Sequence, residues 1–152
     1  ALKYFILKVD PKKNMLFNPA ESVDFNGNTG PFIQYTYARI KSVLRKAEEA
    51  GYEVTFAPSA SVELVSFEKD LLRKIHDFPM VVEQASALHS PAVIANYAYE
   101  LASEYNRFYH ELTILKEESP AIRTLRLSLS QFTARVIANA LWLLGIEVPE
   151  RM

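Results

Sequence analysis

The sequence predicts an all-α protein, a helical bundle of about five helices preceded by a short connector. Three observations lead to this fold class. Apolar residues recur at spacings of three and four along most of the chain, which is the period of one face of an α-helix. Proline or glycine stands where most of these patterns begin or end. Hydrophobic residues make up 49% of the 152 residues, enough for one sizeable core.

The first thirty residues are expected to form the connector. One side of a short opening helix carries the apolar residues Leu2, Phe5, Ile6 and Val9. Asp10-Pro11 ends this helix, because the residue before proline is pushed out of the α region. Short extended pieces are expected at 15–17 and 23–25, and 26–30 has the composition of a turn. The chain starts inside an apolar pattern and without methionine, so we expect it to belong to a longer protein.

The helical domain is expected over residues 31–152. Its first helix begins at Pro31, because proline is tolerated in the first turn, and it stops at Gly51. A link through Pro58 leads to a second helix that ends near Phe78-Pro79. The apolar positions are Ile33, Tyr37, Ile40, Leu44 and Ala47 in the first helix and Leu64, Phe67, Leu71, Leu72 and Ile75 in the second.

Three further helices complete the expected bundle. They are a short one over 81–88, a longer one over 91–111 and a last one over 120–145. Serine and proline at the start of the last helix suit its first turn, and glycine at its end is a common stop. Following the apolar period, Tyr97, Tyr105 and Phe108 are expected in the core, and Trp142 is expected to be packed.

Chemistry that the residue types could support is limited. The chain has no cysteine, and its four glycines cannot form a phosphate-binding loop or a dinucleotide fingerprint. The histidines are His76, His89 and His110, whose separations do not suit two ligands on adjacent helical turns. We therefore expect surface or helix-end histidines, and no catalytic residue, metal or cofactor in this chain.

The same composition bears on location and assembly. No run of eighteen apolar residues and no signal-peptide pattern occurs, and the absence of cysteine suits a reducing compartment. We expect a cytoplasmic monomer with no membrane partner.

Charge is distributed unevenly along the chain. The net charge is −1 with a pI near 6.4, which by itself argues against a domain that coats nucleic acid. Two expected helices nevertheless contain basic residues and no acid: residues 31–47 hold Arg39, Lys41, Arg45 and Lys46, and residues 120–145 hold Arg123, Arg126 and Arg135. One basic surface on a nearly neutral protein is therefore expected.

A polar row lies on the first long helix, away from its apolar face. Its members are Tyr35, Arg39, Ser42 and Lys46, at spacings of four, three and four. An aromatic ring one turn from a guanidinium, with a lysine beyond, can stack an unpaired base and hold its phosphate. The alternative is structural: Tyr35 would pack against a neighbouring helix, and Arg39 would cap or bridge to an acid.

Three segments resemble one family. Residues 30–40 read G-P-F-I-Q-Y-T-Y-A-R-I, and residues 143–152 read L-L-G-I-E-V-P-E-R-M. Residues 91–109 are similar to the middle helix of the same domain. The combination resembles the C-terminal, DALR-type anticodon-binding domain of arginyl-tRNA synthetases, with the first thirty residues similar to the tail of the catalytic domain that precedes it.

The resemblance implies a function for the parent protein. It would be an ATP-dependent arginine-tRNA ligase, using ATP with Mg²⁺, in which this part contacts the anticodon loop of tRNA. The H-I-G-H-type and K-M-S-K-S-type strings of class I synthetases do not occur here. The chain itself is therefore expected to bind tRNA without catalysing adenylate formation, and its other partner would be the upstream catalytic domain.

Site residues follow in part from the resemblance. It carries anticodon contact onto Tyr35, Arg39 and Met152, and the polar row adds Ser42 and Lys46. An aromatic that relatives often present near 113–115 is replaced here by Ile114 and Leu115. Two alternatives remain open: a helical adaptor that binds proteins, and the related domain of another class I synthetase, such as a cysteinyl or glycyl enzyme.

Overall fold

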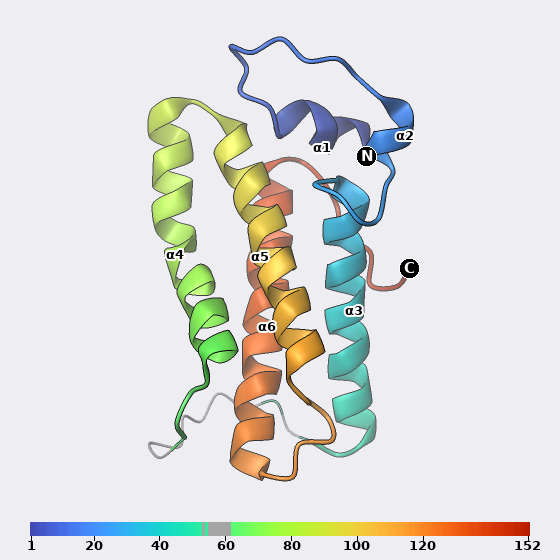
Figure 1. Cartoon of the computed structure of the whole chain (residues 1–152), viewed down its shortest axis with the longest axis vertical. Helices are drawn as coiled ribbons and strands as arrows, with labels where there is room; N and C mark the ends of the chain where they lie inside the picture. The colour runs from blue at the N-terminus through green and yellow to red at the C-terminus, as the bar shows by residue number, and fades with distance from the viewer. Residues whose placement is uncertain (53, 55–61) are drawn as a thin grey trace.

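The computed structural model describes residues 1–52, 54 and 62–152 as a bundle of long helices capped at one end by the N-terminal segment (Figure 1). The helices are α1 (Leu2–Leu7), α2 (Pro19–Ser22), α3 (Gly30–Glu49), α4 (Ser66–Leu88), α5 (Pro91–Glu111) and α6 (Pro120–Leu143). None of the described residues lies in a strand, so the all-α prediction is confirmed. The expected link through Pro58 lies outside the described residues.

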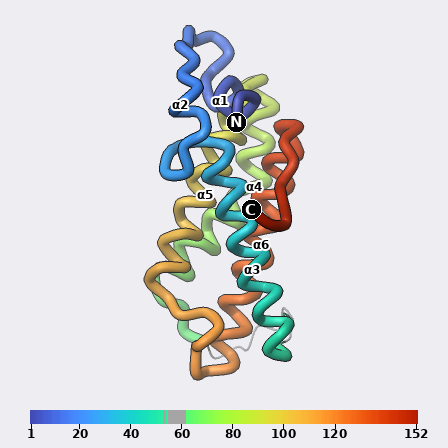
Figure 2. The backbone as a smooth tube through the Cα atoms, turned by 90° about the vertical axis from the view of Figure 1, so that its right-hand side faces the viewer, coloured from blue at the N-terminus to red at the C-terminus, as the bar shows by residue number. Residues whose placement is uncertain are grey.

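Helices α5 and α6 form the centre of the bundle. Each packs against the other and against α3 and α4, and the four long helices run side by side (Figure 2). Helix α1 packs against α5. The largest fully buried side chains include Ile33 and Ile40 of α3, Leu71 of α4, Leu101, Tyr105 and Phe108 of α5, and Leu127, Ile137 and Leu141 of α6. Each such side chain contributes about 1.5–3 kcal/mol through burial. The expected core positions Tyr97, Tyr105 and Phe108 are confirmed.

Helix α4 corrects the expected break at Phe78-Pro79. It runs on through the proline, so the separate helix expected over 81–88 is its C-terminal part. A proline inside a helix costs about 3 kcal/mol, but contacts with α5 hold the chain beside it. Phe78 stacks on Tyr97 with ring centroids 5.5 Å apart, and the Tyr97 hydroxyl donates to the carbonyl of Lys74 at 2.6 Å. Packing therefore outweighs the local preference to end the helix.

The N-terminal segment also differs from expectation. Helix α1 buries Tyr4 and Phe5, whereas Leu2 and Ile6 are exposed. The Tyr4 hydroxyl lies 2.9 Å from the carbonyl oxygen of Ala95, and burial raises the pKa of Tyr4, so it stays a hydrogen-bond donor. Residues 15–17 and 23–25 form no strands, because an extended segment needs a partner for its backbone groups.

Three long helices end with a residue in the left-handed conformation. These residues are Gly51, His89 and Gly145, with φ of 74°, 49° and 66°. In each case the next residue donates its backbone N–H to the carbonyl five residues back, in the Tyr52–Ala47, Ser90–Ala85 and Ile146–Leu141 pairs. This is the Schellman arrangement, in which glycine avoids the steric cost of a Cβ. Only His89 carries that cost among the three.

Replacing His89 with glycine is therefore expected to stabilise the protein. Relief of the left-handed strain is worth more than the extra backbone entropy that glycine loses on folding, so the free energy of unfolding should rise by about 0.5–1 kcal/mol. Gly145→Ala is the opposite control: its Cβ would meet Lys3 Nζ at 3.3 Å in a left-handed residue, so stability should fall. Urea unfolding measures the free energy of unfolding of both variants. A change in the same direction for both would contradict the explanation by left-handed strain.

Two further features of the described residues concern function. His76, His89 and His110 are exposed, and no group of three His, Cys, Asp or Glu side chains in the described part of the chain could hold a metal ion. Among the same residues, no helix combines the length and the apolar character needed to cross a membrane.

Candidate nucleic-acid interface

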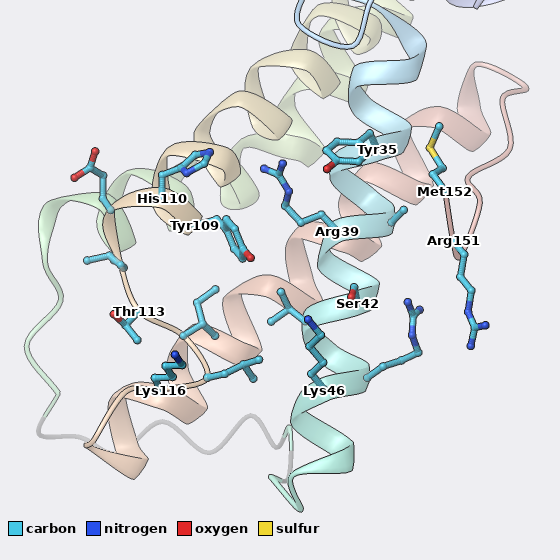
Figure 3. A pocket seen from close by; sticks show the side chains of 17 residues that line it. Tyr35, Arg39, Ser42, Lys46, Tyr109, His110, Thr113, Lys116, Arg151 and Met152 are labelled. Carbon is cyan, nitrogen blue, oxygen red and sulfur yellow. The ribbon is translucent and has the colours of Figure 1, made fainter.

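A groove of about 820 Å³ runs along one side of the bundle (Figure 3). One wall is α3, the other is formed by the end of α5 and the loop before α6, and the C-terminal residues border the α3 side. The groove brings together all five residues that the sequence singled out: Tyr35, Arg39, Ser42, Lys46 and Met152.

Helix α3 places its polar row in the groove because its opposite face is buried. Ile33 and Ile40 are fully buried against the bundle, which turns the row outward. Tyr35 is 42% exposed, and its ring packs edge-to-face with that of Phe25, with centroids 6.1 Å apart. Lys46, at the far end of the row, is exposed.

Arg39 occupies the centre of the site. Its guanidinium carbon lies 4.9 Å from the ring centroid of Tyr35 and 5.3 Å from that of Tyr109, so it stands between two aromatic rings. One guanidinium nitrogen donates to Asn106 Oδ1 at 2.6 Å. The Asn106 amide nitrogen in turn donates to Thr36 Oγ1 at 3.0 Å. These contacts fix the direction of the guanidinium. Its hydrogen-bond partner, Asn106, is an amide and not a carboxylate, so this contact does not neutralise the charge of Arg39.

Tyr109 lines the groove and was not among the residues singled out from the sequence. Its ring is 38% exposed and lies across the groove from Tyr35 (Figure 3). In the link that follows, Ile114 is buried in the core. The available signal was the position of Tyr109 on the last turn of α5, one residue off the apolar row that Tyr105 and Phe108 follow.

The groove carries a clear excess of positive charge. Its basic lining residues are Arg39, Arg45, Lys46, Lys116 and Arg151, and its one acidic side chain is that of Glu111. Lys46 and Lys116 come from opposite walls (Figure 3). The overall charge of −1 therefore conceals a local surface suited to an anion.

The C-terminal tail is held on α3 by three polar contacts. Gln34 Nε2 donates to the carbonyl of Glu147 at 2.7 Å, and Arg45 donates to the carbonyl of Glu150 at 3.2 Å. Lys41 pairs with the Glu150 carboxylate at 3.2 Å. The tail thereby brings the exposed side chain of Met152 to the border of the groove near Tyr35 (Figure 3).

The second acid-free stretch does not add to this surface. Arg126 is buried and paired at 2.7 Å with both Glu68 and Glu117. Arg123 lies over the ring of Tyr52 at 4.0 Å and donates to a backbone carbonyl. The local charge of residues 120–145 was misleading, because Glu68 and Glu117 neutralise Arg126, and neither Arg123 nor the exposed Arg135 lines the groove.

Trp142 was expected to be packed, and that expectation is wrong. Its side chain is 75% exposed at the end of α6, outside the residues that line the groove. It follows the buried Leu141 directly, so the helix turns it outward.

An all-helical bundle whose basic groove presents tyrosine rings has the features of a nucleic-acid-binding module. The chain belongs to the DALR anticodon binding domain family, whose model matches residues 33–152. Arginine-tRNA ligases of Phocaeicola vulgatus and Bacteroides thetaiotaomicron are 59% and 57% identical to it over all 152 residues. These residues are 25% and 26% of the two relatives, so the chain spans about a quarter of their length.

Solved structures agree with this assignment. The arginyl-tRNA synthetase of Thermus thermophilus superposes with a TM-score of 0.89 at 35% identity, over 99% of this chain and 26% of that one. The enzyme of Plasmodium falciparum gives a TM-score of 0.85 at 26% identity, over 99% of this chain and 26% of that one. The expected family and the helical fold are therefore confirmed.

Proposed function

We propose that this chain binds the anticodon loop of an arginine tRNA, as the C-terminal part of an arginine-tRNA ligase. The observation that carries the proposal is Arg39, held by Asn106 between the rings of Tyr35 and Tyr109 in a basic groove. The family match and the names of the relatives support the same conclusion.

Each residue of the site has a physical role in this proposal. The ring faces of Tyr35 and Tyr109 stack bases that leave the loop's own stack, because such stacking is available to any unpaired base. Arg39 and Lys46 attract phosphates, and Ser42 between them offers a hydroxyl to sugar or phosphate oxygens. Met152 provides an apolar contact at the edge of the groove.

The remaining parts of the proposal concern the parent protein. It joins arginine to tRNA using ATP with Mg²⁺ in a catalytic domain upstream, and we assign no residue of this chain to that chemistry. Residues 1–30 connect that domain to the anticodon-binding domain over 31–152. The parent is a cytoplasmic monomer.

Binding of tRNA by the purified chain is expected to weaken steeply with salt. About 3 to 5 phosphate contacts at −0.7 each predict a slope of roughly −2 to −3.5 for log affinity against log salt. Fluorescence titrations of an arginine-tRNA transcript at several salt concentrations measure this slope.

A transcript with a replaced anticodon loop is the matched control, and its affinity should be lower at every salt concentration. Equal affinity for the two transcripts would contradict anticodon binding. Absence of any tRNA binding would favour the alternative of a helical adaptor that binds proteins.

A further inference from the structure

The second wall of the groove is a loop with little regular structure of its own. Residues 112–119 connect α5 to α6, and 112–116 of this loop line the groove. Within the loop, the Glu117 N–H donates to the Ile114 carbonyl at the long distance of 3.4 Å. Something other than secondary structure must therefore hold this wall in place.

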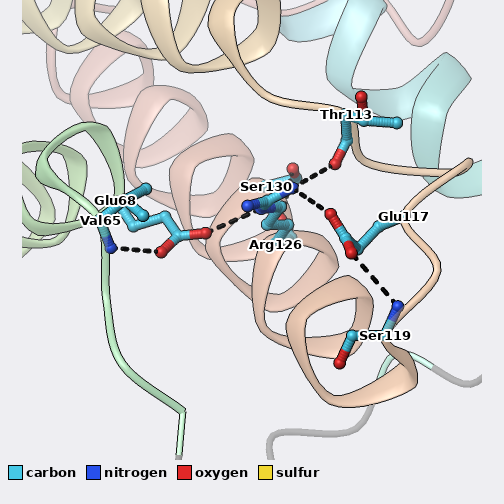
Figure 4. A network of polar contacts seen from close by, with 7 residues as sticks. All are labelled: Val65, Glu68, Thr113, Glu117, Ser119, Arg126 and Ser130. Carbon is cyan, nitrogen blue, oxygen red and sulfur yellow. Dashed lines mark hydrogen bonds and ion pairs between the residues drawn. The ribbon is translucent and has the colours of Figure 1, made fainter.

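A buried arginine on α6 provides that support (Figure 4). One guanidinium nitrogen of Arg126 lies 2.6 Å from the carbonyl oxygen of Thr113 and 2.7 Å from Glu117 Oε2. A single group thus holds both ends of a five-residue stretch. Glu117 also accepts the backbone N–H of Ser119 through its other oxygen, at 3.2 Å, which fixes the end of the loop at the start of α6.

The arginine is itself anchored on the far side. Its Nε donates to Glu68 Oε1 at 2.7 Å, and Glu68 is 1% exposed. Glu68 Oε2 accepts the backbone N–H of Val65 at 2.9 Å, at the first turn of α4 (Figure 4). The contacts link α4, the loop and α6 through charge-assisted hydrogen bonds, which are about twice as strong as neutral ones.

We propose that Arg126 and Glu117 are positioning residues for tRNA binding, and this inference rests on the function proposed above. Buried and paired with two carboxylates, Arg126 cannot contact a phosphate itself. It acts by holding the 112–116 wall, including Lys116, at a fixed distance from α3. A wall already in place spares the complex the entropic cost of ordering it.

Glu117→Gln tests the positioning role without removing the buried arginine that supports the fold. The variant leaves the Arg126–Glu68 pair intact, but its amide cannot accept from both the guanidinium and the Ser119 N–H. Glu118→Gln is the matched control, because it removes the same charge from the adjacent exposed residue. Removal of an acid beside a basic groove should by itself strengthen RNA binding, so the two explanations predict opposite signs.

Positioning predicts that Glu117→Gln binds the arginine-tRNA transcript about five- to tenfold more weakly than Glu118→Gln, with a near-native melting curve. Equal or tighter binding by Glu117→Gln would overturn the inference.

Glu117→Asp keeps the charge but shortens the side chain, and it replaces Glu117→Gln if that variant does not fold. Weaker binding than the wild type supports positioning, and wild-type affinity overturns it. If the wild type and Glu118→Gln both fail to bind tRNA, the proposed function fails as well. If the wild type and Glu118→Gln bind tRNA and the Glu117 variants bind it with the same affinity, only the positioning role is refuted.

Discussion

Arg126→Met is expected to lower the free energy of unfolding by about 3–5 kcal/mol, because it leaves Glu68 buried without a partner for its charge. The pair is nearly inaccessible to water, with 8% and 1% of the two side chains exposed, so solvent screens it little. A loss of this size is a large share of the stability of a single domain. Thermal unfolding should show a fall in Tm of roughly 10 °C.

Adding Glu68→Leu to the Arg126→Met variant provides the control. The double variant removes the uncompensated carboxylate, so it should recover part of the lost stability, as happens when a whole buried pair becomes apolar. Urea unfolding of the two single variants and the double variant gives the coupling between the residues. A near-native Tm for Arg126→Met alone would mean that the buried pair does not support the fold.

Arg39→Ala is expected to weaken tRNA binding about tenfold to a hundredfold, or roughly 1.5–3 kcal/mol for a charged hydrogen-bonding contact. The variant removes the cation between Tyr35 and Tyr109 and leaves both rings in place. Its effect on stability should be small, about 1 kcal/mol, because it breaks one hydrogen bond to Asn106 and no ion pair. Tyr35→Ala should behave in the same way.

Arg73→Ala is the matched control for charge. Arg73 lies exposed on α4, pairs with Asp70 one turn away, and does not line the groove. Titrations with the arginine-tRNA transcript, together with thermal melts, compare the variants. Strong destabilisation of Arg39→Ala with unchanged tRNA affinity would place the anticodon site elsewhere on the bundle.

The sequence by itself determined most helices and the direction of their faces. The expected bounds of the helices at 31–51, 91–111 and 120–145 agree closely with α3, α5 and α6. In α3 and α5 the apolar spacing identified the buried side, and the polar row on α3 lies in the groove as a result. In α6 it did not, because Leu127, Ile137 and Leu141 are the fully buried large residues whereas Leu143 is exposed. The family resemblance, which rested on the segments 30–40, 91–109 and 143–152, was confirmed.

Only the tertiary structure decided what faces each helix. Periodicity reports which side of a helix is buried, but it carries no information about the segment that covers it. Packing against α5 keeps α4 helical through Pro79. Polar contacts between the C-terminal tail and α3 place Met152 near Tyr35. Net charge along a segment likewise omits acids brought from elsewhere by folding. Glu68 and Glu117 therefore turned Arg126 from an expected surface cation into a buried link, because opposite charges removed from water must pair.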